Sequence, residues 1–239
     1  MVPSILQRAK AALAAGNDEP SNRERATVEL DTKLLQQVRP YTLASVKKLG
    51  NLKRLASSTT ARGIAGDFVE CGTYKGGSAA VLGSALGPER HLWLYDSFEG
   101  MPEVKAVDGT DANEWVGKLR ASDEDVKEVL TSVGLSPNQY TIRKGWFDQT
   151  FLQPLPERVA LLHCDADWHA SVTVVLETFY PRVAEGGVVV LDDFGWWEGC
   201  REAFYDFCAR HGEKPLLERM DCDQAYWIKG KTNNRTGQD

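Results

Sequence analysis

The sequence of 239 residues lacks any apolar run as long as the ~20 residues that a membrane-spanning helix needs. Acidic side chains outnumber basic ones by 34 to 28, so the net charge is −6 and no general positive field exists to attract nucleic acid. Near the N-terminus, Gln7, Arg8 and Lys10 interrupt the apolar residues, and we expect no secretory signal there. The sequence therefore predicts a cytoplasmic protein with neither membrane nor nucleic acid as partner.

Cysteine is sparse and irregularly spaced. The chain has an odd number of cysteines and no C-x-x-C pair: Cys71, Cys164, Cys200, Cys208 and Cys222. Such spacing argues against both a disulfide framework and a zinc site. We predict buried free thiols in a reducing compartment.

From Gly66 onward, short apolar runs alternate with helical segments, which is typical of βαβ units and a mostly parallel sheet. The last two strands are separated by only three residues, a link too short for a parallel crossover, so they should form an antiparallel hairpin. This pattern predicts an α/β, Rossmann-like fold of the class I methyltransferase type, with a seven-stranded, mostly parallel sheet and one antiparallel strand. The predicted strands are 67–71, 91–96, 140–144, 159–165, 187–192, 215–220 and 224–229.

The first strand leads into a glycine-rich turn and then a predicted helix over 78–86. The spacing Gly72-x-x-x-Gly76-Gly77 matches neither G-x-G-x-x-G nor a phosphate loop, which disfavours a pyrophosphate ligand. Glu70 would suit the ammonium of a methionyl group, and Asp96, 19 residues after Gly77, could accept hydrogen bonds from ribose hydroxyls. The pattern favours S-adenosylmethionine; the alternative is a tight turn and a helix-capping aspartate.

A second group of carboxylates follows two later strands. Asp165 and Asp167 follow the strand over 159–165, and Asp192 and Asp193 follow the one over 187–192. Since the carboxyl ends of parallel strands meet in one crevice, Asp165, Asp192 and Asp193 should converge although 27 residues separate the first two. Oxygen-only ligands favour Mg²⁺ or Ca²⁺ over zinc, and Mg²⁺ if water and substrate complete the shell. The alternative is helix capping, chiefly by Asp167.

Taken together, these motifs resemble the macrocin O-methyltransferase (TylF/MycF/NovP) family, over roughly residues 40–230. The resemblance implies S-adenosylmethionine as methyl donor and Mg²⁺ at Asp165, Asp192 and Asp193. It assigns the cofactor contacts to Glu70, Gly72, Thr73, Tyr74, Ser78, Asp96, Ser97 and Asp165. The segments that carry it are 66–78, 96–102, 145–147, 165–171, 192–195 and 199–203.

One segment departs from that family. Its members commonly read Asp-x-Asp-Leu-Tyr-Glu-Ser-Thr where this chain has Asp165-Ala-Asp-Trp-His-Ala-Ser-Val172, so His169 replaces a tyrosine. A neutral imidazole could act as general base, and Asp165 is the other candidate for that catalytic role. Packing or capping by His169 is the alternative.

We expect a Mg²⁺-dependent O-methyltransferase of antibiotic or other secondary metabolism, acting on a sugar or polyketide hydroxyl of a small molecule, most plausibly a deoxysugar of a glycosylated metabolite. Trp168, Trp196 and Trp197 flank the carboxylates and could contact such an acceptor. The rival hypotheses are an inactive cofactor-binding interaction protein and a metal-dependent nucleotide-sugar transferase.

The expected organisation is an N-terminal helical appendage over 1–60, a methyltransferase domain over 61–230 and a polar tail over 231–239. Residues 99–138, between the second and third strands, are long enough for a lid in addition to a connecting helix. The extra N-terminal helices and the family resemblance favour a homodimer or higher homo-oligomer.

Overall fold

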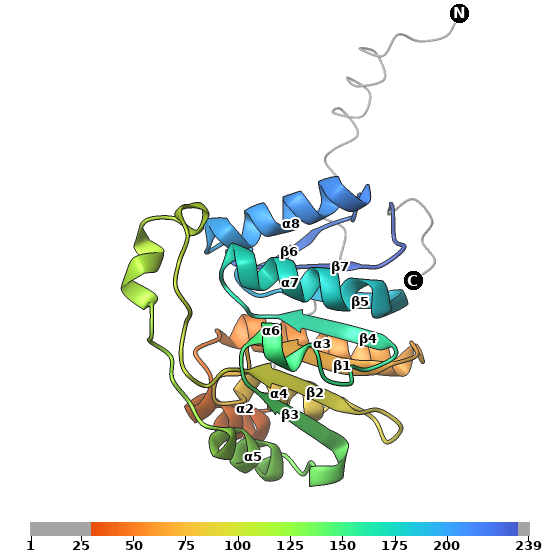
Figure 1. The fold of residues 1–239 in the computed structure, drawn as a ribbon. Helices are drawn as coiled ribbons and strands as arrows, with labels where there is room; N and C mark the ends of the chain where they lie inside the picture. Colours follow the sequence, from red (N-terminus) through yellow and green to blue (C-terminus); the bar gives the residue numbers. More distant parts are fainter. Residues whose placement is uncertain (1–29, 234–239) are drawn as a thin grey trace, which may run out of the picture.

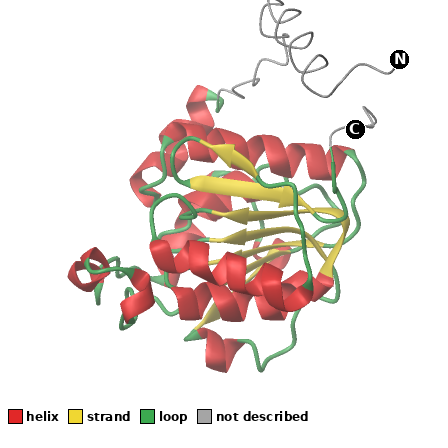
Figure 2. Cartoon of the chain, turned by 90° about the horizontal axis from the view of Figure 1, so that it is seen from above, coloured by secondary structure: helices red, strands yellow, loops and turns green. Residues whose placement is uncertain are grey.

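The structure, a computed structural model, describes residues 30–233. Seven strands form one sheet in the order β3-β2-β1-β4-β5-β7-β6, with helices on both of its faces (Figures 1 and 2). The strands are β1 Asp67–Cys71, β2 Leu92–Asp96, β3 Tyr140–Lys144, β4 Val159–Cys164, β5 Val183–Leu191, β6 Glu218–Met220 and β7 Gln224–Ile228.

The pairing pattern confirms the predicted mixed sheet. Strands β1 to β5 pair in parallel, whereas β7 pairs antiparallel with both β5 and β6. Two predicted strand starts were wrong by three or four residues, and four other strand boundaries differ from the prediction by one residue. Strand β5 begins at Val183, which pairs with Val159, and not at Gly187. Strand β6 is limited to Glu218–Met220, because only these residues pair with β7.

Seven helices surround the sheet in the described residues: α2 Thr32–Val38, α3 Val46–Ala61, α4 Gly77–Gly83, α5 Asp123–Ser132, α6 Phe147–Thr150, α7 His169–Phe179 and α8 Glu198–His211. Helix α4 ends at Gly83, short of the predicted Leu86. The next turn has hydrogen bonds between residues three apart, as in a 3₁₀-helix, such as that from Ala85 N–H to Leu82 O. At α5, the Ser122 hydroxyl and the Asp125 carboxylate form a reciprocal capping box, which fixes the start of the helix.

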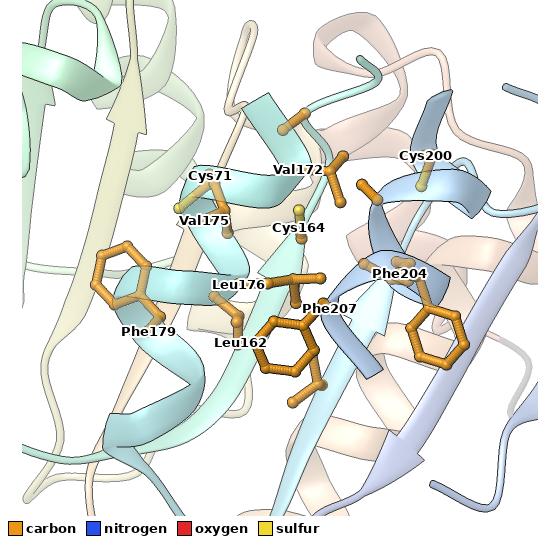
Figure 3. Packing of buried hydrophobic residues seen from close by; sticks show 14 of the residues in the cluster. Cys71, Leu162, Cys164, Val172, Val175, Leu176, Phe179, Cys200, Phe204 and Phe207 are labelled. Carbon is orange, nitrogen blue, oxygen red and sulfur yellow. The ribbon is translucent and has the colours of Figure 1, made fainter. Parts of the chain in front are cut away.

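Two apolar cores lie on opposite faces of the sheet, because side chains alternate along each strand. On β1, Phe68 faces α2–α5, whereas Val69 and Cys71 face α7 and α8. Figure 3 shows this second core, in which side chains of α7 and α8 such as Phe179 and Phe207 pack over the strands. Both cores are fully buried, so the carboxyl ends of the strands are held on a rigid base.

Helix α3 belongs to the core of the sheet. It contacts α4, β4, β5 and β6, and its Leu49, Leu52 and Leu55 are buried. The division at residue 60 stays a prediction, as does that at 230. Residues 1–29, including the predicted leader-free N-terminus, and 234–239 of the predicted tail lie outside the described residues.

Residues 99–121, here called the 99–121 segment, leave the sheet after β2 and extend beyond the helical layers (Figure 1). The buried Asp108 attaches this segment to α7: one carboxylate oxygen accepts the backbone N–H of His169 at 2.7 Å and the other that of Lys105 at 2.7 Å. Trp168 Nε1 donates to the carbonyl of Pro102 at 3.1 Å. The segment therefore has fixed contacts at the end of the sheet where parallel-strand proteins bind ligands.

All five cysteines are free thiols, as predicted. Cys71, Cys164 and Cys200 are buried, but the predicted burial was wrong for the half-buried Cys208 and the exposed Cys222. Between residues 30 and 233, no helix is both long and apolar enough to cross a membrane.

Candidate active site

A cavity of about 390 Å³ lies at the carboxyl ends of β1, β2, β4 and β5. Every residue that the sequence assigned to the site lines this cavity except Glu70 and His169. The predicted residues that line it are Gly72, Thr73, Tyr74, Ser78, Asp96, Ser97, Asp165, Asp192 and Asp193. The glycine-rich turn after β1 and the carboxylates after β4 and β5 thus share one cavity.

Asp96 organises the turn that follows β1. Its Oδ2 accepts the backbone N–H groups of Thr73 at 2.8 Å and Tyr74 at 2.7 Å, and its Oδ1 accepts that of Phe98 at 2.6 Å. Burial raises the pKa of the Asp96 carboxyl, and the three N–H donors oppose that rise. Since a carboxylate has about four acceptor positions, one stays open toward the cavity.

Gly72 places the glycine-rich turn after β1 against the carboxylate cluster. Its φ is +86°, and a Cβ built on it would lie 1.7 Å from the backbone oxygen of Asp165. Asp165 N–H also donates to the carbonyl of Cys71 at 2.9 Å. No larger side chain fits at residue 72, so the ends of β1 and β4 are held in direct contact.

Glu70 points away from the cavity. It is fully buried, and its Oε1 lies 2.9 Å from Nδ1 of His163, which is its register partner on β4. Nε2 of His163 lies 3.2 Å from Oδ1 of Asp192. The imidazole thus connects the two carboxylates inside the sheet. Burial disfavours its charged form, but the hydrogen bonds to Asp192 and Glu70 outweigh this and raise the pKa of His163 to about 9.

The carboxylates after β4 and β5 lie close enough to share a cation. Oxygens of Asp165, Asp167 and Asp193 lie within 4.8 Å of one another, and Asp165 forms a second such group with His163 and Asp192. Burial and the neighbouring carboxylates raise the pKa of Asp165 and Asp167, and raise that of Asp193 to about 6. Burial acts in the same direction on Asp192, but His163 and Lys48 hold its pKa below the ordinary value.

Lys48 of α3 was not predicted as a site residue, yet it lines the cavity. Its Nζ lies 2.6 Å from Oδ2 of Asp192, 3.2 Å from Asp223 and 3.9 Å from Asp193. Burial lowers the pKa of Lys48, but Coulombic attraction by Asp192, Asp193 and Asp165 outweighs this and raises it. The sequence does hold a signal: Lys48 falls on the stripe formed by Leu52, Leu55 and Thr59, which is the buried face of α3.

His169 lies outside the cavity, at the start of α7. Its Nε2 is 3.0 Å from the exposed carboxylate of Asp206 on α8. Gln224 was also missed by the sequence analysis. Its Nε2 donates to Oδ1 of Asp192 at 2.8 Å, and its own Oε1 accepts from Asn51 of α3 at 2.5 Å.

Aromatic side chains also line the cavity. Trp115 of the 99–121 segment stacks edge-on against Trp197, whose Nε1 donates to Asp167 at 3.0 Å. Trp196 also lines the cavity and is 62% exposed, whereas Trp168 is buried beneath them and does not line it. Two of the three tryptophans singled out by the sequence thus face the site.

Comparisons with known proteins agree with this geometry. The family model Macrocin-O-methyltransferase (TylF) matches residues 4–229. A tetracenomycin 4'-O-methyltransferase of Streptomyces olivaceus, specific by its name for a 2,3-dimethoxy-rhamnosyl substrate, is 34% identical over 78% of this chain and 75% of its own length. The mycinamicin III 3''-O-methyltransferase of Micromonospora griseorubida is 31% identical over 78% of both chains.

The solved structure of the O-methyltransferase NovP matches with a TM-score of 0.73 at 27% identity, covering 80% of this chain and 83% of that one. Fold and site define a class I methyltransferase. The chain belongs to the macrocin O-methyltransferase (TylF) family, and it is accordingly an S-adenosylmethionine-dependent O-methyltransferase.

The buried His163 should make stability depend on pH. Because its pKa of about 9 in the fold exceeds the ordinary value near 6.5, its stabilisation is complete below pH ~6.5 and is lost as the pH rises through about 9. We expect the free energy of unfolding to fall by up to about 3 kcal/mol over this range, measured by urea denaturation in EDTA. A His163→Gln variant should lose this pH dependence, whereas the exposed His211→Gln should keep it; equal slopes for parent and His163→Gln would contradict the assignment.

Proposed function

We propose that this enzyme transfers a methyl group from S-adenosylmethionine to a hydroxyl of a sugar on a glycosylated small natural product, with Mg²⁺ bound beside the acceptor. The observation that carries this proposal is the single cavity that joins a cofactor turn to a carboxylate cluster. The names of the relatives support it, since the Streptomyces olivaceus enzyme acts on a rhamnosyl tetracenomycin. A cytoplasmic homo-oligomer stays a prediction.

The cofactor is placed at the turn between β1 and α4. Thr73 is buried and its Oγ1 has no hydrogen-bond partner in the protein, although the residue lines the cavity. A buried hydroxyl without a partner is costly, so a polar ligand group is expected to complete it. The open acceptor position of Asp96 would take a ribose hydroxyl, and the buried Ser78 and Ser97 lie alongside.

The carboxylate cluster fits a divalent cation. It offers only oxygen ligands on the cavity side, and Oδ2 of Asp193 is buried without a partner. Asp165, Asp192 and Asp193 would hold the ion, with Asp167 adjacent, and this donor set suits Mg²⁺. When bound, Mg²⁺ supplies Lewis-acid activation of the acceptor hydroxyl.

Asp165, rather than His169, is assigned as the general base that removes the proton of the acceptor hydroxyl. Asp165 lines the cavity and its pKa is raised, whereas His169 faces Asp206 outside it. A general base must reach the proton that it removes, so position decides between the two residues.

The charge of the cavity also bears on the acceptor. Among the described residues that line it, Lys48 is the only lysine or arginine, and it already contacts Asp192 and Asp223. A nucleotide diphosphate would place two further negative groups beside the carboxylates, and the described lining offers no free lysine or arginine to receive them. This disfavours the nucleotide-sugar transferase hypothesis, and the retained carboxylates argue against an inactive binding protein.

Replacement of Asp96 by Asn should weaken cofactor binding. The variant keeps the side-chain volume but loses the charge and one acceptor oxygen. A hydrogen bond to a charged group contributes about 1.5–3 kcal/mol, so we expect the affinity to fall roughly 10- to 100-fold. Calorimetry with S-adenosylhomocysteine measures the effect. Glu89→Gln, exposed before the start of the same strand, is the matched control and should bind like the parent; equal affinity for Asp96→Asn would refute the cofactor placement.

Methyl transfer should require the divalent cation. Excess EDTA should abolish transfer to a rhamnosylated aromatic polyketide, and added Mg²⁺ should restore it, because the cation both neutralises the carboxylates and activates the hydroxyl. Asp193→Ala should lose Mn²⁺ binding and turnover together. Full activity in EDTA would overturn the metal assignment. Efficient methylation of a nucleoside-diphosphate rhamnose in place of the glycoside would overturn the acceptor assignment.

Loss of the His169 imidazole should leave the chemical step nearly intact. Since His169 contacts Asp206 and not the cavity, His169→Ala should keep kcat within about threefold of the parent, as should the control Asp206→Ala. Steady-state kinetics from pH 6 to 9 provides the measurement. A loss of kcat of about 10²-fold with unchanged KM in His169→Ala alone would instead identify His169 as the base.

A further inference from the structure

The N-terminal helix α3 places a positive charge inside the carboxylate cluster. Lys48 is 6% exposed and lies in the first turn of α3, whose other buried residues anchor the helix to the sheet. The adjacent residue, Lys47, is also a lysine, but its side chain is 65% exposed. It forms an ion pair with Asp221 at 3.5 Å, outside the cavity. The two adjacent lysines thus have different surroundings.

The ammonium of Lys48 forms a direct ion pair with one carboxylate oxygen of the cluster. Oδ2 of Asp192 receives Lys48 Nζ at 2.6 Å, while Oδ1 receives His163 and Gln224 at 3.2 and 2.8 Å. Both oxygens of Asp192 are therefore bonded within the protein. Asp193, by contrast, is 3.9 Å from the ammonium and keeps a buried Oδ2 without a partner.

Two cations directed to the same carboxylates oppose each other. A divalent ion at Asp192 and Asp193 must share or displace the contact that Lys48 makes with Asp192, and the like charges repel across a medium of low dielectric constant. Without any cation, the buried carboxylates would repel one another, so Lys48 stabilises the empty cluster.

We propose that Lys48 is a tethered counter-ion that balances the cluster in the metal-free enzyme and competes with the divalent cation for Asp192. Lys48 thereby sets the metal affinity below the value that the carboxylates alone would give. This inference rests on the metal site of the proposed function. It gives α3 a role in the chemistry of the site: the enzyme stays folded without metal, and the metal is held weakly enough to exchange.

The test compares four variants with the parent. Lys48→Met removes the charge at similar length, Lys48→Gln removes it but keeps an N–H donor for Asp192, Lys48→Arg keeps the charge, and Lys47→Met is the matched control. Mn²⁺ affinity is measured by calorimetry with S-adenosylhomocysteine present, and the Tm of each metal-free variant is measured in EDTA. These readouts do not depend on turnover.

We expect Mn²⁺ to bind Lys48→Met and Lys48→Gln at least tenfold more tightly than the parent, and the Tm of both in EDTA to fall. Lys48→Arg and Lys47→Met should stay within about threefold of the parent affinity. If Lys48→Met does not fold, Lys48→Gln alone decides. Equal or weaker binding by the neutral variants, in a parent that binds Mn²⁺, would overturn the counter-ion role; a parent that binds no Mn²⁺ would instead refute the proposed metal site.

Discussion

Buried negative charge at the ends of β4 and β5 is the constraint on which the site depends. Asp165, Asp167, Asp192 and Asp193 lie within one small region, and an unpaired buried carboxylate costs several kcal/mol. The protein meets this cost with cations from elsewhere in the fold: His163 from within β4 and Lys48 from α3. The packing of α3 on the sheet is therefore linked to the electrostatics of the site as well as to the apolar core.

Much of this arrangement could be predicted from local sequence. Strands such as 67–71 and 140–144 were found at their true bounds because apolar runs flanked by glycine and polar residues are local signals. The convergence of Asp165 with Asp192 follows from topology, since parallel strands present their carboxyl ends at one edge. The start of β5 at Val183, which pairs with Val159, could not be found in this way. A pair of glycines follows it and interrupts the apolar run, so the run indicates a later start.

Side-chain direction was the part that sequence could not supply. Glu70 and His163 face each other because they are register partners on neighbouring strands, so the carboxylate turns to the imidazole rather than to the cofactor. Lys48 and Asp223 are 175 residues apart, and no spacing rule connects them. Tyr74 and Asp167, with φ of 50° and 55°, adopt a left-handed backbone that non-glycine residues rarely take, and both line the cavity.

The close contact of Gly72 with Asp165 has a consequence for engineering the enzyme. Because no side chain fits between them, the turn after β1 and the carboxylates after β4 form one unit, and any larger residue at position 72 would displace both. The 99–121 segment joins this unit through the contacts of Asp108, Trp115 and Pro102 and through Met101 and Ala112, which are buried in the core beside α7 and α8. Since this segment supplies Met101, Pro102, Trp115 and Leu119 to the cavity lining, exchanging it between relatives together with its buried anchors offers a route to altered acceptor choice that leaves the turn and the carboxylates in place.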